Sequence, residues 1–310
     1  MLLKDVIKTC KYVMDNSEFV KINYDNLDKF IESINCDNLQ NWLKFNPYNI
    51  LDFNVDTIIN LLLIYESICY SFWGNPRWTI ETDEGFKDGS DALLYIIINY
   101  VRRTNNTDFS TISFNEFKEI LKGNTDIPLL KERYKTVTEI SRIVNEKMNG
   151  NFYEYIYNIS SDTELFDVIV NNFNSFKDER LYNNRTVYFY KLAQLLTSDI
   201  LHIRESLENI KVDYSNLSGC ADYKIPQVLQ ALKITEYNKE LLNLILSKKQ
   251  IDISSKYEVE IRASQIVVID YIKNKLQKFN SIDINDYLFV YSKTVKQIAK
   301  PYHLCRNTNY

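Results

Sequence analysis

A single carboxylate, Asp222, stands among small and apolar residues in the stretch SGCADYKIPQVL, residues 218–229. Pro226 has a fixed φ and no N–H group, which suits the first position of a helix, and Val228 and Leu229 follow at helical spacing. We therefore predict that Asp222 lies in the loop before a helix, near its exposed N–H groups. Such a carboxylate can be solvated, can cap the helix or can be held for catalysis, and the spacing alone leaves these interpretations open.

A second candidate is the pair Glu258 and Arg262, whose i, i+4 spacing lets them meet on one helix face. The following run, SQIVVIDYI, is apolar on several faces and predicts a buried helix. A buried pair there would orient either the core or a ligand phosphate, whereas an exposed pair would be an ordinary surface ion pair. The two histidines, His202 and His303, have no evident partner nearby and are expected to be structural.

The composition favours helices that could position these residues. The chain has 310 residues, 45% hydrophobic and 25% charged, as is ordinary for a globular protein. It holds 23 Tyr and 16 Phe but only 6 Gly and 5 Pro. So few turn-forming residues favour long helices over a sandwich or barrel of many strands.

Charge and cysteine usage limit the partners. The net charge of −4 gives no sign of the basic face that a nucleic acid polymer requires. Five scattered cysteines without a CxxC pair, together with two histidines, make a zinc site unexpected and suit the cytoplasm. The longest apolar run, from Ile58, is broken by Asn60 and Glu66, so it predicts a buried helix and no membrane contact. Nothing in the sequence indicates an oligomeric state.

Helical signals dominate the chain. In TISFNEFKEILKG, Ser113 and Glu116 predict a capping box, and Gly123 is expected to end the helix. Ser161 and Glu164 repeat the box pattern. Apolar periodicity predicts helices over about 4–14, 26–35, 55–72, 90–103, 128–148, 187–206, 226–246, 256–279 and 284–298.

Strand signals are few, and the clearest is RWTIET, residues 77–82, before a turn. There is no repeat, no low-complexity linker, and no GxGxxG, P-loop, GxSxG or HExxH motif. We expect an all-α fold with at most a few short strands, in which residues 1–310 form a single compact multi-helix domain.

Several strings in order along the chain carry a resemblance: SFW, IPLLKERYKTV, FYKLAQLL, ADYKIPQVL, YEVEIRAS and DYLFVYS. Together they resemble the queuosine salvage protein family, the queuosine 5′-phosphate N-glycosylase/hydrolases. The resemblance implies an all-α fold similar to helical DNA glycosylases. It also implies cleavage of queuosine 5′-monophosphate to queuine and ribose 5-phosphate, for queuine salvage in tRNA modification. No metal or other cofactor is expected, and the partners are the small nucleotide and the free base.

The resemblance places the family's catalytic carboxylate on Asp222. Breaking an N-glycosidic bond builds positive charge on the ribose at C1′ and O4′. A preorganised carboxylate can stabilise that charge or form a covalent intermediate before water attacks. The departing 7-deazaguanine has no N7 to protonate, so hydrogen bonds to its other edge must assist its departure.

The sequence departs from the family pattern where the base would be recognised. Cys220 replaces an aromatic residue, and Leu43 replaces a histidine before the NP of residues 46–47. In the late motif, Asn285 stands for the first carboxylate, Asp286 takes the aromatic place, and Val290 replaces the last carboxylate. A valine cannot pair with a donor, so these changes put the exact base in doubt more than the reaction.

The remaining candidates are weaker. Phe72 and Trp73 could stack on the base, although an aromatic pair after an apolar helix is more often core. Tyr223 could bond the ribose or simply pack as structure. The candidates for the 5′-phosphate are Lys191, Arg204, Lys224 and Arg262.

Two other classes of function stay open on the sequence. A protein that binds a 7-deazapurine base or nucleotide without cleaving it would explain the altered positions 43, 220 and 290. A helical interaction scaffold rests on the α-helical pattern alone, and it would need an exposed apolar groove.

Overall fold

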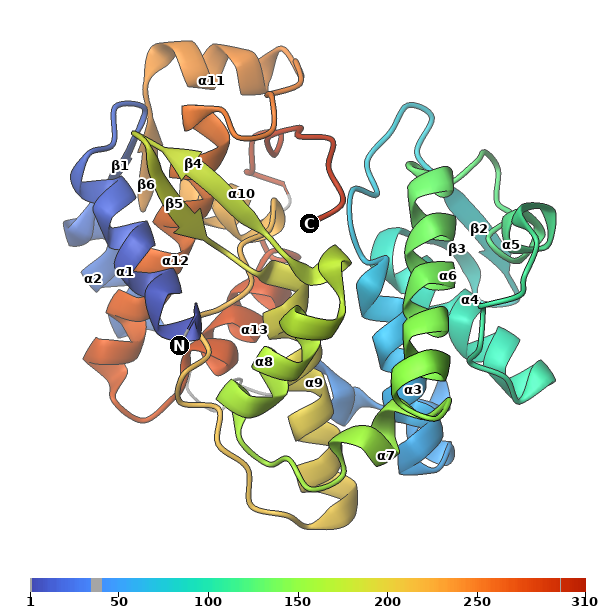
Figure 1. The fold of residues 1–310 in the computed structure, drawn as a ribbon. Coiled ribbons are helices and arrows are strands. Elements are labelled where there is room, and N and C mark those ends of the chain that lie inside the picture. Colours follow the sequence, from blue (N-terminus) through green and yellow to red (C-terminus); the bar gives the residue numbers. More distant parts are fainter. Residues whose placement is uncertain (1, 35–40, 296) are drawn as a thin grey trace.

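The computed structural model describes residues 2–34, 41–295 and 297–310 (Figure 1). Its helices are α1 (Leu2–Asp15), α2 (Tyr24–Ser33), α3 (Val55–Ser67), α4 (Gly89–Thr104), α5 (Phe114–Ile120), α6 (Leu130–Lys147), α7 (Phe152–Ile156), α8 (Asp162–Asn172), α9 (Lys191–Glu208), α10 (Lys224–Ala231), α11 (Lys239–Leu246), α12 (Lys256–Leu276) and α13 (Ser281–Tyr291). Short 3₁₀ turns are η2 (Trp42–Phe45), η3 (Pro47–Asp52) and η4 (Asn174–Phe176).

The strands form three antiparallel pairs of two strands each within the described residues. These pairs are β1 (Val20–Ile22) with β6 (Thr235–Tyr237), β2 (Thr79–Thr82) with β3 (Gly85–Asp88), and β4 (Glu179–Tyr182) with β5 (Arg185–Tyr188). The predicted mostly helical fold with a few short strands is confirmed, and so is the ribbon that follows Arg77.

Two apolar helices organise the core. Helix α12 is buried along most of its length and packs against α1, and α3 packs lengthwise against α9. Figure 1 shows α3–α6 on one side and α1, α2, α10, α12 and α13 on the other, with α8 and α9 between them. One cluster of buried residues reaches from Val6 in α1 through Ile59 in α3 to Ile266 in α12. This shared core supports the prediction of one domain, which stays a prediction.

Four predicted helices are wrong in extent, and one of them, 55–72, ends at Ser67. The span 226–246 divides into α10, strand β6 and α11, because Lys233 takes a left-handed φ of 57° and the chain then pairs with β1. The span 187–206 opens with the end of β5, and α9 starts at Lys191. The span 284–298 is helical only as far as Tyr291.

The two predicted capping boxes have different outcomes. Ser113 accepts the N–H of Glu116 at 3.2 Å, and the Glu116 carboxylate accepts the N–H of Ser113 at 2.8 Å, so this box is confirmed. That helix ends at Ile120, before Gly123. The box at Ser161 is wrong, since Ser161 makes no side-chain cap bond. No helix in the described part of the chain combines the length and apolarity needed to cross a bilayer.

Candidate active site

Asp222 binds the N-terminus of α10 through one of its two carboxylate oxygens. Its Oδ1 accepts the backbone N–H of Lys224 at 2.8 Å and of Ile225 at 3.0 Å. These bonds start the helix at Lys224, so the predicted start at Pro226 is wrong, while the predicted position of Asp222 before the helix is confirmed. Both bonds end on Oδ1, and Oδ2 accepts no hydrogen bond from the described residues.

The surroundings of Asp222 shift the pKa of its carboxyl group in two opposite directions. The side chain is half-buried, and burial raises the pKa of its carboxyl. The N–H of Ile225 and the ammonium of Lys191 lower the pKa of the same carboxyl and offset part of the burial. The helix N-terminus therefore favours the ionised form that could stabilise a cationic sugar.

Helix α12 holds the backbone of the Asp222 loop. The Asp222 N–H donates to Gln265 Oε1 at 3.1 Å, and Gln265 Nε2 donates to the Cys220 carbonyl at 2.6 Å. Between these two bonds, Arg262 Nε donates to the Ala221 carbonyl at 3.1 Å. Three successive residues are thus fixed by two buried side chains, so the position of the carboxylate is set before substrate arrives.

Helix α13 reaches the same loop from the other side. Asn285 Oδ1 accepts the Cys220 N–H at 2.9 Å, and Asn285 Nδ2 donates to Asp286 Oδ1 at 3.3 Å. Asn41 Nδ2 donates to Asp286 Oδ2 at 3.3 Å. Val290 is 43% exposed on this helix, whereas Asn285 and Asp286 take the buried face. Contact of Val290 with a substrate stays a prediction.

Three buried carboxyl groups meet near this loop, and we call Glu66, Asp199 and Asp286 the acid cluster. They come from α3, α9 and α13. Burial raises the pKa of all three, that of Glu66 to about 7, and Asp199 shares a side-chain hydrogen bond with Glu66. Trp42 Nε1 donates to both Asp199 oxygens at 3.1 Å. The cluster, like the other acidic, His and Cys side chains that are described, lacks an arrangement able to hold a metal ion.

Lys191 is the buried cation next to this cluster. It begins α9, and its Nζ donates to the Cys69 carbonyl at 3.2 Å. Burial acts to lower the pKa of its ammonium, but neighbouring Cys69, Glu66 and Asp222 raise that pKa above its ordinary value. The positive charge of Lys191 therefore faces the acid cluster and Asp222.

Glu66→Gln is expected to flatten the pH dependence of stability. The folded pKa of about 7 lies above the ordinary value of 4.5, so the stability present below pH 4.5 is lost as pH rises through 7. We expect the melting temperature of the wild type to fall by about 5 °C relative to Glu66→Gln between pH 5 and pH 8. Thermal unfolding at both pH values measures this, with the exposed Glu119→Gln as the control. Parallel melting curves for wild type and Glu66→Gln would contradict it.

Arg262, predicted to bind substrate, belongs to a buried ion network instead. Its Nη1 and Nη2 donate to Asp178 at 2.9 and 2.5 Å, and Nη1 also donates to Glu258 at 3.2 Å. The rings of Phe189 and Tyr310 lie 4.0 and 4.2 Å from its guanidinium carbon. Burial of the Glu258–Arg262 pair is confirmed, but the guanidinium is occupied by protein groups. The predicted contact of Arg262 with substrate is therefore replaced by another role, in which Arg262 positions the Asp222 loop through the Ala221 carbonyl.

Arg204 is occupied in a similar way. Its guanidinium donates to the backbone carbonyls of Ile156, Tyr157 and Ile159 and to the Glu208 carboxylate at 2.7 Å. Those contacts tie α9 to the end of α7. Arg204 is therefore no phosphate ligand, and the helix-end carbonyls explain its burial.

The predicted aromatic residues Phe72, Trp73 and Tyr223 are all buried or half-buried. Phe72 is buried against the Arg133 guanidinium, 4.8 Å from its ring centroid. Trp73 is buried too, while Tyr223 is half-buried. Burial raises the pKa of the Tyr223 hydroxyl, so it stays protonated. The contacts of Phe72 favour a role in the core, and stacking of either ring on a base stays a prediction.

Leu43 lines a cavity of about 190 Å³ that Asp222 does not border. His202 lines it as well, stacked on Tyr214, and Asn41 connects the cavity to the acid cluster through Asp286. His202 Nδ1 lies 2.8 Å from the Ser198 carbonyl, which supports the structural role predicted for it. Contact of Leu43 with a substrate stays a prediction.

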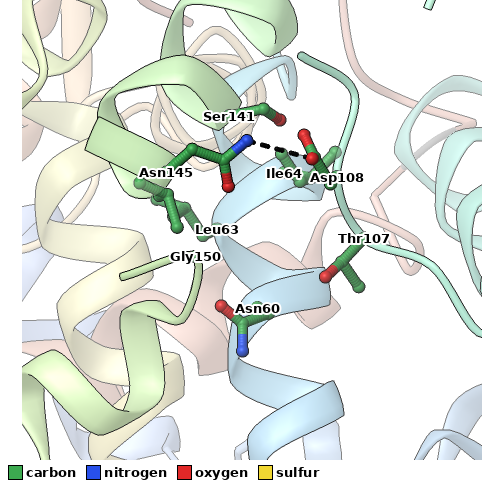
Figure 2. A pocket seen from close by; sticks show the side chains of 9 residues that line it. Asn60, Leu63, Ile64, Thr107, Asp108, Ser141, Asn145 and Gly150 are labelled. Carbon is green, nitrogen blue, oxygen red and sulfur yellow. Dashed lines mark hydrogen bonds between the residues drawn. The ribbon is translucent and has the colours of Figure 1, made fainter. Parts of the chain in front are cut away.

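A second cavity, of about 20 Å³, lies between α3, α6 and the loop after α4 (Figure 2). Figure 2 shows its polar lining, in which Asn145 Nδ2 donates to Asp108 Oδ2 at 3.0 Å, with Asn60 and Thr107 nearby. Its volume suits about one water molecule. It contains none of the residues around Asp222 and has no room for a nucleotide.

Sequence reasoning missed Asn41, Glu66, Asp199 and Gln265. Glu66 does interrupt the most apolar helix of the chain, and Asp199 stands in the apolar run LLTSDILHI. An acid in an apolar helix is a usable signal, because buried carboxylates are rare unless they are paired or functional. Nothing in the sequence pairs the two acids, since they are 133 positions apart and meet only because α3 packs on α9.

A held carboxylate beside buried neutral acids provides the groups that enzymes use to cleave glycosidic bonds. Residues 51–310 match the model of the family described as queuosine salvage protein. The chain therefore belongs to the queuosine salvage protein family.

Named relatives cover most of the chain. A Sphaerobacter thermophilus protein named queuosine 5′-phosphate N-glycosylase/hydrolase is 29% identical over 82% of each chain. Proteins of the same name from Bos taurus and Mus musculus are 26% and 24% identical, over 82% and 98% of each chain.

Proposed function

We propose that this chain hydrolyses the N-glycosidic bond of queuosine 5′-phosphate to give queuine and ribose 5-phosphate, for salvage of the base in tRNA modification. Membership of the family and the names of the relatives support this substrate. The observation that carries the reaction type is the fixed Asp222 carboxylate, with Oδ1 bound to the helix and Oδ2 open.

The reaction needs a negative charge at the sugar and a proton at the base. As the C1′–N bond breaks, its electron pair leaves with the base, and the Asp222 carboxylate stabilises the cationic C1′ or bonds to it. Water then supplies the oxygen at C1′ and releases a proton. A neutral carboxyl of the acid cluster can donate a proton to the departing base, because burial raises the pKa of each member.

The site departs from the family pattern without losing these groups. Cys220 contributes its backbone N–H and carbonyl to Asn285 and Gln265, so an aromatic side chain is not needed to fix the loop. The replacement at Val290 lies on the surface and leaves the acid cluster intact. We propose that the substrate is a small nucleotide rather than a polymer, and that the protein acts in the cytoplasm.

Incubation of the purified protein with queuosine 5′-phosphate tests the proposal. We expect the release of free queuine and ribose 5-phosphate. Chromatography and mass spectrometry detect both products. Saturable binding with no release after prolonged incubation would instead identify a non-catalytic binder. Absence of both binding and release would refute the proposed substrate.

A further inference from the structure

The C-terminal segment 302–310 brings an arginine to the Asp222 loop. Arg306 lies across the indole of Trp73, with its guanidinium carbon 3.5 Å from the ring centroid. Its Nη1 donates to the Ser71 carbonyl at 3.2 Å, the one hydrogen bond of this side chain within the described residues. The guanidinium is half-buried. Arg306 therefore keeps donors available for a ligand, in contrast to Arg204 and Arg262.

The segment is fixed rather than loosely attached. Ser71 Oγ donates to the Asn307 carbonyl at 2.7 Å, and the Ser71 N–H donates to the Tyr310 carbonyl at 2.9 Å. Tyr310 is buried against Arg262, which binds the backbone just before Asp222. The backbone that carries Arg306 is thus tied to Ser71 and contacts Arg262 through Tyr310, and Figure 1 shows the C-terminal end between the two groups of helices.

An unpaired donor lies beneath the guanidinium. The side chain of Trp73 is 7% exposed, and its Nε1–H has no hydrogen-bond partner among the described residues. A buried donor without a partner costs about 1–3 kcal/mol, so such groups point to an absent acceptor. An anion bound to Arg306 at the edge of the indole would supply that acceptor.

Further positive charge surrounds Tyr223, the residue after Asp222. Its ring lies 4.8 Å from that of Tyr302, and Lys224 Nζ lies 4.9 Å from the Tyr302 ring centroid. Arg77 and Arg306 both act electrostatically on the Tyr302 hydroxyl. The acid Asp88 pairs with Arg77 at 3.0 Å, whereas Arg306 has no ion pair among the described residues.

We infer that Arg306, with Trp73 Nε1 and Lys224, binds the 5′-phosphate of the nucleotide substrate and selects nucleotides over nucleosides. A guanidinium beside an aromatic plane is a favoured arrangement for a phosphate, which accepts two parallel N–H bonds. The sugar would then lie between this phosphate site and Asp222, with the base toward the acid cluster. The inference rests on the proposed function for the identity of the substrate.

Arg306→Gln separates phosphate recognition from the reaction. We expect kcat/KM for queuosine 5′-phosphate to fall by about 30- to 100-fold, as for loss of a charged hydrogen-bond donor. The kcat/KM for unphosphorylated queuosine should stay within about 2-fold of the wild type, and Arg306→Lys should recover part of the loss. Arg142→Gln removes an exposed arginine of α6 as the charge-matched control, and it should change neither value.

Equal losses on both substrates, or no loss on the nucleotide, would overturn the inference while leaving the proposed function in place. If the wild type cleaves neither substrate, the proposed function fails, and a binding measurement then decides the inference. Ribose 5-phosphate should raise the melting temperature of the wild type and of Arg142→Gln but not that of Arg306→Gln. An equal shift in all three proteins would refute a phosphate site at Arg306.

Discussion

Asp222→Asn is expected to lower kcat for nucleotide hydrolysis at least about 1,000-fold while leaving the fold intact. An asparagine keeps an oxygen that can accept the N–H groups of Lys224 and Ile225, so the start of α10 is preserved. It loses the negative charge that would face the cationic sugar. Steady-state release of queuine by the wild type and by the variant gives the ratio of their kcat values.

A second substitution distinguishes the two roles of Asp222. Asp222→Ala removes both the charge and the helix contact, so it should lose activity to a similar degree and also lose about 1 kcal/mol of stability. Urea denaturation of both variants separates these effects. Turnover within about 10-fold of the wild type in Asp222→Asn would show that the carboxylate does not carry the reaction.

The second large effect concerns stability, since Arg262→Met should lower the free energy of unfolding by about 3–5 kcal/mol. Arg262 and Arg180 balance the buried carboxylates of Asp178 and Glu258. Removing one cation leaves an uncompensated negative charge that water cannot reach. The apolar methionine side chain does not replace the lost positive charge.

An exposed ion pair provides the control for this experiment. Lys122 pairs with Glu119 at 3.0 Å, and both side chains are largely exposed, so Lys122→Ala should change stability by less than about 0.5 kcal/mol. Urea denaturation monitored by circular dichroism gives both values. A loss below about 1 kcal/mol in Arg262→Met would mean that the network contributes little to the fold.

The helical class and most helix positions followed from local patterns. Apolar spacing predicted the helix around Ile59, and the Ser113–Glu116 spacing predicted a capping box that forms. The division of 226–246 was not predictable in this way. Strand β6 exists because β1, over 200 positions earlier, lies beside it, and local spacing carries no such information.

The sequence by itself determined where the key carboxylate stands along the chain. Asp222 precedes an apolar helix, and its side chain is long enough only for the next few N–H groups, so its helix contact is a local property. The tertiary structure alone decided what surrounds it. Glu66 and Asp199 come from distant segments and meet because α3 packs on α9, and Arg306 reaches the Asp222 loop because the C-terminal segment is bound to Ser71. Long-range packing sets those distances, and no spacing within one segment encodes them.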